Sequence, residues 1–141
     1  MDLLDAFAQI DNYLEEKTLQ FWLRANADTI SAPSTVYVGL HTGDPGEDGT
    51  SNELVGNGYS RTSGSFGNVS VIGDVVSITN NADIEFGPAS ASWGEITHMS
   101  IWDSASGSTN CLFKGALSSS KTVDINDSFK FATGNLTVTM D

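Results

Sequence analysis

Hydrophobic positions along the chain follow two different periods, and the change between them divides the sequence into two parts. Over the first 27 residues the apolar side chains recur at spacings of three, four or seven, as do Leu3, Phe7, Ile10, Leu14 and Phe21. This spacing places them on one face of a helix. The pattern therefore predicts an N-terminal helical segment over residues 1–30, with the helix itself ending shortly before the Ser-Ala-Pro sequence.

The end of this predicted helix is unusually apolar, because Phe21, Trp22 and Leu23 are consecutive and one stripe cannot hide all three. The segment either packs on the protein's own body or reaches a neighbouring molecule. Packing on its own body is the default expectation, because it hides apolar surface from water within one chain. If the segment reaches a neighbour, Phe7, Phe21 and Trp22 are the expected anchors, since large aromatic side chains dominate contact energies.

From residue 35 onward the hydrophobic period becomes two, which is the period of a strand with one buried face. Short strand-like runs follow one another, separated by turn residues that include the serines at 118–120. The predicted strands are 36–41, 59–66, 68–72, 75–79, 84–86, 95–103, 110–117, 121–125, 128–132 and 136–140. No helical pattern is interleaved, so residues 31–141 are predicted to form a mainly β domain: an antiparallel β-sandwich, jelly-roll-like, or a barrel.

Composition narrows the possible partners. The 141 residues suit a single domain, and a formal net charge of −12 opposes binding to nucleic acid or to an anionic membrane. The single cysteine excludes an internal disulfide and a thiolate metal cluster. No run of 18 apolar residues exists, and the acidic start differs from a signal peptide, so synthesis in a cytoplasm is expected.

No catalytic, cofactor-binding or metal-ligating set emerges from the spacing of reactive residues. His41 and His98 each lie in a strand pattern with hydroxyls or acids nearby in sequence, but a catalytic triad requires geometry that sequence proximity does not supply. Partly buried strand residues are the preferred interpretation of both histidines. Cys111 lies in an apolar run and is expected to be a small buried side chain.

An acidic, glycine-rich loop over residues 43–58 is a further candidate contact. Asp44, Glu47 and Asp48 lie close together, but the ligand spacing of a calcium-binding EF-type loop is missing. A solvated loop is preferred, and a calcium ion at a subunit contact remains the alternative. Its glycines and acids predict that the loop is mobile or is ordered only by a neighbour.

Trp93 and Trp102 bracket one predicted strand. Exposed tryptophans stack on sugars or partner proteins, so both are candidate contacts. Closing the ends of the sandwich core is the preferred interpretation.

The order of several motifs resembles a family of small virion proteins of tailed bacteriophages, often labelled tail-fibre proteins. The most specific pieces are Leu-His-Thr-Gly-Asp-Pro at 40–45 and Gly-Tyr-Ser-Arg at 58–61, followed by Asn-Asn-Ala-Asp-Ile-Glu-Phe at 80–86 and Ile-Trp-Asp-Ser at 101–104. The resemblance covers nearly the whole chain. It implies a virion component made in the bacterial cytoplasm, and it implies no catalytic residues.

Two placements in the virion follow as expectations. Fibre repeats and heptads are absent, so a compact, oligomeric capsid decoration (cement) subunit that contacts the major capsid protein is the main hypothesis. The alternative is a tail-fibre, tail-tip or adaptor component involved in host attachment. In both, the chain associates with itself, as a trimer or another homo-oligomer, and with other virion proteins. A small hydrolase or lectin that uses the histidines is a third, disfavoured hypothesis.

Overall fold

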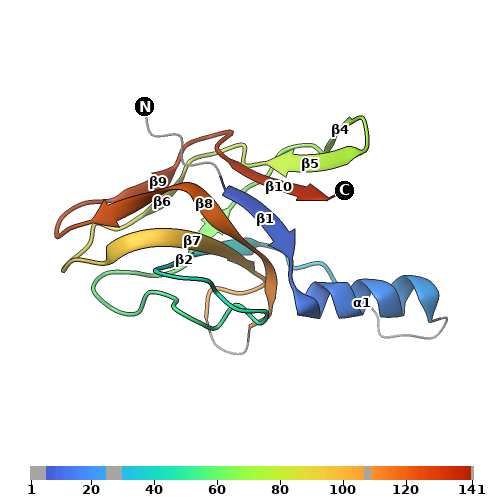
Figure 1. Cartoon of the computed structure of the whole chain (residues 1–141), viewed down its shortest axis with the longest axis horizontal. Helices are drawn as coiled ribbons and strands as arrows, with labels where there is room; N and C mark the ends of the chain where they lie inside the picture. Colours follow the sequence, from blue (N-terminus) through green and yellow to red (C-terminus); the bar gives the residue numbers. More distant parts are fainter. Residues whose placement is uncertain (1–5, 25–29, 107–108, 141) are drawn as a thin grey trace.

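The structure of the protein is a computed structural model that describes residues 6–24, 30–106 and 109–140, with side chains described from residue 9 onward. Within this part of the chain, one helix and ten strands follow one another, and most of the residues in regular elements are in strands (Figure 1). The elements are β1 (Ala6–Ile10), α1 (Asn12–Leu23), β2 (Val36–His41), β3 (Thr62–Gly64), β4 (Ser70–Ile72), β5 (Val75–Thr79), β6 (Ile84–Phe86), β7 (Gly94–Trp102), β8 (Cys111–Val123), β9 (Phe129–Phe131) and β10 (Leu136–Met140).

Eight of these strands form one sheet in the order β3-β2-β7-β8-β1-β10-β5-β4, and β6 and β9 form a separate antiparallel pair. Neighbouring strands are antiparallel except for β1 and β10, which are parallel. The two sheets share one apolar core, which includes side chains from β2, β6, β7, β9 and β10. The predicted class is therefore confirmed: the fold is mainly β and sandwich-like, with an N-terminal helix.

The core is formed by alternation along short strands. In β6 and β9 the first and third residues are buried and the middle residue is exposed, which is the period-two pattern of a half-buried strand. Their rings pack edge-to-face, with Phe129 and Phe131 at a centroid distance of 5.1 Å and Phe86 at 6.1 Å from Phe129. Such aromatic pairs add about 0.5–1.5 kcal/mol each beyond the burial of their area.

Strand β8 differs from its prediction, because it continues through the expected turn at 118–120 as one strand of 13 residues. The pairing of β8 with β7 shifts in this region, from Ile96 opposite Lys121 to His98 opposite Ala116. The residues between Ala116 and Lys121 therefore form a bulge in an otherwise continuous strand. Bulges absorb extra residues while keeping a strand paired, so a serine run that predicts a turn is accommodated inside the sheet.

The N-terminal segment is helical over only part of its predicted length. Residues 12–23 form α1, and Asp11 caps it by accepting a hydrogen bond from the backbone N–H of Asn12 (2.9 Å). The prediction is wrong for residues 6–10, which form β1 between β8 and β10. Without β1, both of these strands would expose an unpaired edge, so sheet pairing overrides the helical spacing of the apolar residues.

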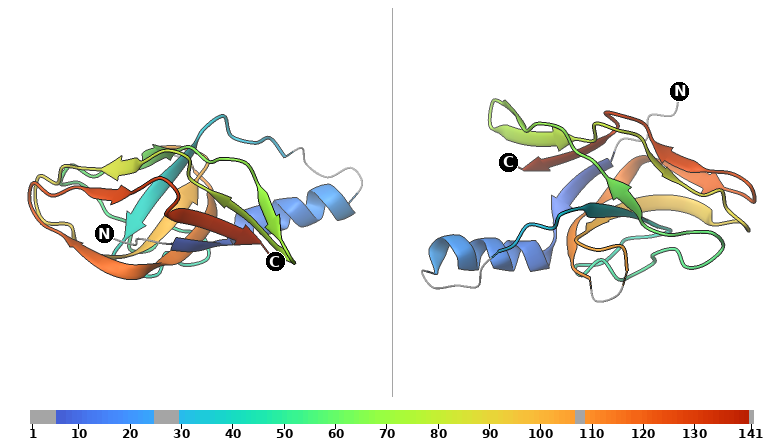
Figure 2. Two further views of the ribbon diagram at one scale, coloured as in Figure 1. Left: turned by 90° about the horizontal axis from the view of Figure 1, so that it is seen from above. Right: turned by 180° about the vertical axis from the view of Figure 1, so that it is seen from behind.

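Helix α1 extends away from the β-body instead of covering it (Figures 1 and 2). None of its residues is buried, and its regular part ends at Leu23, before the predicted end. The expectation that the helical segment covers its own sandwich is therefore wrong for α1. In the part of the chain that the structure describes, no helix has the length and apolar character needed to cross a membrane.

Candidate functional site

The two residues that most resemble catalytic groups are fully enclosed in the β-body. His41 at the end of β2 and Ser100 in β7 each have no exposed surface, and the His41 Nε2 lies 2.7 Å from the Ser100 Oγ. The His41 Nδ1 lies 2.8 Å from the Ser51 carbonyl oxygen, which accepts hydrogen bonds only, so Nδ1 carries the proton. Nε2 of the neutral ring therefore accepts from the Ser100 hydroxyl.

Ser100 in turn accepts a hydrogen bond from the indole Nε1–H of Trp102 at 2.6 Å. Each polar atom of this chain of groups has a partner. Burial lowers the pKa of His41, and this effect is larger than that of the Ser51 hydrogen bond and the Glu53 charge, which raise it. The hydroxyl of Ser100 is thus held inside the protein and is not presented to a substrate. The arrangement links the 43–58 loop to the sheet, which agrees with the preferred structural interpretation of His41.

A second polar cluster surrounds Trp102. Arg61 makes two hydrogen bonds to the Glu53 carboxylate, at 2.7 Å and 2.8 Å, and its guanidinium lies 3.6 Å from the centre of the Trp102 ring. Tyr59 also donates to Glu53 at 2.9 Å. Burial alone would raise the pKa of Glu53, but the hydrogen bonds and charge of Arg61 lower it below its usual value. The pair fixes the end of the loop and shields one face of Trp102.

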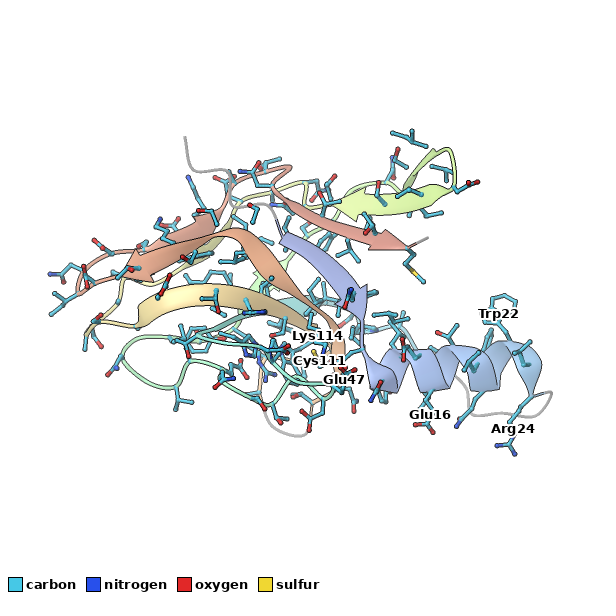
Figure 3. The ribbon with its side chains drawn as sticks, viewed as in Figure 1. Glu16, Trp22, Arg24, Glu47, Cys111 and Lys114 are labelled. Atoms are coloured by element: carbon cyan, nitrogen blue, oxygen red, sulfur yellow. The ribbon has the colours of Figure 1, made fainter. Side chains whose placement is uncertain are left out.

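The acidic loop is held by contacts within its own chain, and its mobility in the free protein stays a prediction. Lys114 of β8 reaches into the loop and pairs with Glu47 at 2.9 Å, as Figure 3 shows near the base of α1. Gly49, at a φ of +74°, lies so close to Cys111 and Trp102 that a Cβ atom there would clash. Only glycine fits this approach without strain.

The carboxylates of the loop are used in local turns. Asp44 accepts from the backbone N–H of Gly46 at 2.8 Å, and Asp48 accepts from that of Thr50 at 3.0 Å. These bonds lower the pKa of both aspartates. Among the described residues, no group of three or more His, Cys, Asp or Glu side chains is placed to hold a metal ion. The side chains of Asp44, Glu47 and Asp48 remain exposed and stay candidate contacts.

Trp93 and Trp102 are buried, with Trp93 donating its indole N–H to the Asn57 carbonyl oxygen at 2.8 Å. Both are therefore unavailable as surface contacts in this structure, and the core interpretation of the two residues is supported. His98 is half-buried, with its Nδ1 2.8 Å from the Thr97 hydroxyl. Cys111 is buried as expected, and burial raises the pKa of its thiol.

The far end of α1 carries the most exposed aromatic side chain among the described residues. Trp22 is 75% exposed and Leu23 is 77% exposed, and Phe21 packs edge-to-face on Trp22 at a centroid distance of 5.2 Å. Figure 3 shows Trp22 at the opposite end of the helix from Glu47 and Lys114. Phe21, Trp22 and Leu23, together with Leu19, are called the helix tip below. Of the remaining predicted anchors, Phe7 lies in β1, but its side chain is outside the described part.

A second apolar surface was not predicted from the sequence. An open groove of about 500 Å³ lies between the start of β2, the residues after β3, and the strands β5, β8 and β10. Its lining includes Val36, Phe66, Val69, Val76, Phe113 and Met140, and none of the residues that line it is charged. The adjoining β4–β5 hairpin exposes Val71 and Ile72 as well. The signal was the two apolar pairs Val71-Ile72 and Val75-Val76, each of which places an apolar side chain on both faces of its strand instead of alternating.

The described residues thus define a class: a small acidic β-domain with its reactive groups buried and with apolar side chains displayed on a helix and along a groove. A family model described as Podophage GP4 fiber I protein gp80 matches residues 9–139, nearly the whole chain. The chain belongs to this family of phage fibre proteins and is a structural component of a phage virion. No curated protein matches the chain.

Proposed function

We propose that the protein is a non-enzymatic tail-fibre or adaptor subunit that works by contacts with other copies and with neighbouring tail proteins. The observation that carries the proposal is α1, a helix that buries none of its own residues and displays Phe21 and Trp22 at its end. An isolated helix of this length is marginal in water, so most helical stability has to come from packing. A partner surface supplies that packing.

The placement of the reactive residues supports a role without catalysis. Ser100 and His41 have the separation of a nucleophile and its base, yet both are fully buried and their polar atoms are used internally. A working nucleophile has to reach its substrate at about 3 Å. These residues therefore serve the stability of the β-body, and the surface is left for recognition.

The family match favours the tail over the capsid. The matching family is described as a fibre protein, and this description fits the tail-fibre alternative better than a capsid decoration subunit. The shape agrees with this choice, since a short body with a projecting helix suits a joint in a larger assembly. The exposed carboxylates of Asp44, Glu47 and Asp48 are proposed as secondary contacts at such a joint.

Copy number in purified virions tests the placement. A tail component is expected in small multiples of three or six, whereas a shell protein is expected in numbers on the order of hundreds, because each follows the symmetry of its site. Quantitative mass spectrometry against the major capsid protein gives the ratio. Hundreds of copies per particle, or density for the chain on the capsid exterior by cryo-electron microscopy, would overturn the tail assignment.

A further inference from the structure

We propose that the helix tip of one copy docks into the apolar groove of a second copy. This inference rests on the proposed role as an assembling fibre subunit and specifies how copies join. Both surfaces belong to the same chain, and each lacks the partner that the other offers: Trp22 and Leu23 are exposed apolar side chains on a projection, and the groove is an apolar hollow.

The distribution of charge favours a second copy as the occupant. The chain has a net charge of −12, so two copies repel each other unless they meet where carboxylates are absent. Residues 18–23 carry no charged side chain, and no charged residue lines the groove. Contact between these two surfaces therefore brings the copies together without burying an unpaired charge, which would be costly.

The length of the helix and a reciprocal arrangement allow the contact. A helix of 12 residues spans roughly 18 Å, enough to carry the tip beyond its own body. From the exposed fractions of its four apolar side chains, the tip presents roughly 400–500 Å², which is about half of what one partner contributes to a standard interface. Each chain takes part in two such contacts, once with its tip and once with its groove, so a reciprocal pair joins the two chains at two places.

Self-association of the purified full-length chain, measured by sedimentation equilibrium, tests the contact. Trp22→Ser removes the largest anchor, and Val69→Glu places a charge in the groove at a residue that is 60% exposed, so folding is preserved. Each is expected to raise the dissociation constant about 30-fold or more, Trp22→Ser because a central aromatic anchor is lost and Val69→Glu because the contact would bury an unpaired charge. Val55→Glu is the matched control, since Val55 is 87% exposed and lies outside both surfaces.

Disulfide trapping identifies the occupant. A mixture of Leu23→Cys and Val69→Cys chains, which retains Trp22 as the anchor, is expected to form a covalent dimer under mild oxidation, and neither chain is expected to do so alone. The native Cys111 does not interfere, because it is buried and burial raises the pKa of its thiol. In the chain that carries both substitutions, linkage between copies supports the proposal, and linkage within one copy would show self-docking and overturn it.

The proposed role and the proposed contact fail in different ways. A monomeric purified chain, or association unaffected by both Trp22→Ser and Val69→Glu, would overturn the contact while the chain is still found in the tail. Capture of the tip by a different tail protein in the assembled particle, with no linkage between copies, would also overturn it. Absence of the chain from the tail would overturn the role itself, whatever the purified chain does in solution.

Discussion

The β-body and helix α1 treat their most distinctive side chains in opposite ways. In the body, His41, Ser100 and Trp102 are enclosed and hydrogen-bonded to one another. In the helix, Phe21 and Trp22 are exposed and contact little beyond each other. Under the proposed function the difference separates stability from recognition, because the groups that look reactive hold the fold and the groups that look like core are available to a partner.

Breaking the Arg61–Glu53 pair is the strongest way to test the role assigned to the body. The side chains are 11% and 17% exposed, so Arg61→Ala leaves a nearly buried carboxylate without its cation and with Tyr59 as its remaining side-chain donor. The free energy of unfolding, measured with denaturant, is expected to fall by about 3–5 kcal/mol. Lys130→Ala, at a pair 49% and 52% exposed, is the control and is expected to cost less than about 1 kcal/mol. Equal effects of the two substitutions would refute the distinction.

Removing the Ser100 hydroxyl tests the enclosed chain of hydrogen bonds. Ser100→Ala leaves the His41 Nε2 and the Trp102 indole N–H without partners, and each buried unpaired group costs about 1–3 kcal/mol. A total loss of roughly 2–6 kcal/mol is expected by chemical denaturation. Unchanged stability would show that the hydroxyl is free, and the hydrolase hypothesis would regain support.

The pH dependence of stability tests the burial of His41, since burial lowers the pKa of His41 in the folded state below 6.5. As pH falls, the unfolded chain therefore takes up the proton first, and the folded state loses stability. Full stability is expected above about pH 6.5, with a loss of up to about 1.4 kcal/mol per pH unit below it, until the folded pKa is reached. Unfolding free energies measured from pH 7.5 to 5.5 give this slope.

His41→Gln is expected to remove the loss of unfolding free energy below pH 6.5, while His98→Gln is expected to retain this loss. A second decline is expected at lower pH, because hydrogen bonds lower the pKa of Asp44, Asp48 and Asp83 in the folded state. Groups of this kind stabilise the fold above their unfolded pKa, and this contribution disappears as they are protonated. A wild-type slope in His41→Gln would contradict the assignment.

The helix tip is expected to give the smallest effect on stability. Phe21 and Trp22 contact little of the body, so Phe21→Ser/Trp22→Ser is expected to change the free energy of unfolding by less than about 0.5 kcal/mol. Matched denaturation curves of the variant and the wild type, measured at a concentration where both are monomeric, provide the test. A loss above about 2 kcal/mol would show that the tip packs on its own body.

How far the sequence predicts this structure depends on whether a pattern is local. The strands 75–79, 84–86 and 136–140 were predicted with the bounds that β5, β6 and β10 have, because period-two alternation and adjacent turn residues are both local signals. The segment 6–10 was predicted as helix and is a strand, since its structure is decided by the free edges of β8 and β10, which lie more than 100 residues away.

The same distinction applies to the candidate site. Phe21 and Trp22 were identified as anchors from their consecutive apolar positions, but their exposure depends on the direction in which α1 leaves the body. The pairing of His41 with Ser100 joins residues 59 positions apart, and no spacing rule predicts it. The groove collects residues from six strands, so only the folded sheet reveals it.

The most direct measurement is incorporation of the Phe21→Ser/Trp22→Ser chain into virions, quantified by mass spectrometry of purified particles against the major capsid protein. Because the variant is expected to fold normally, its copies per particle report recognition alone. The account predicts a decrease of about tenfold or more relative to wild type, as expected for loss of central aromatic anchors. Wild-type incorporation of the folded variant would contradict the claim that the exposed end of α1 is the functional surface.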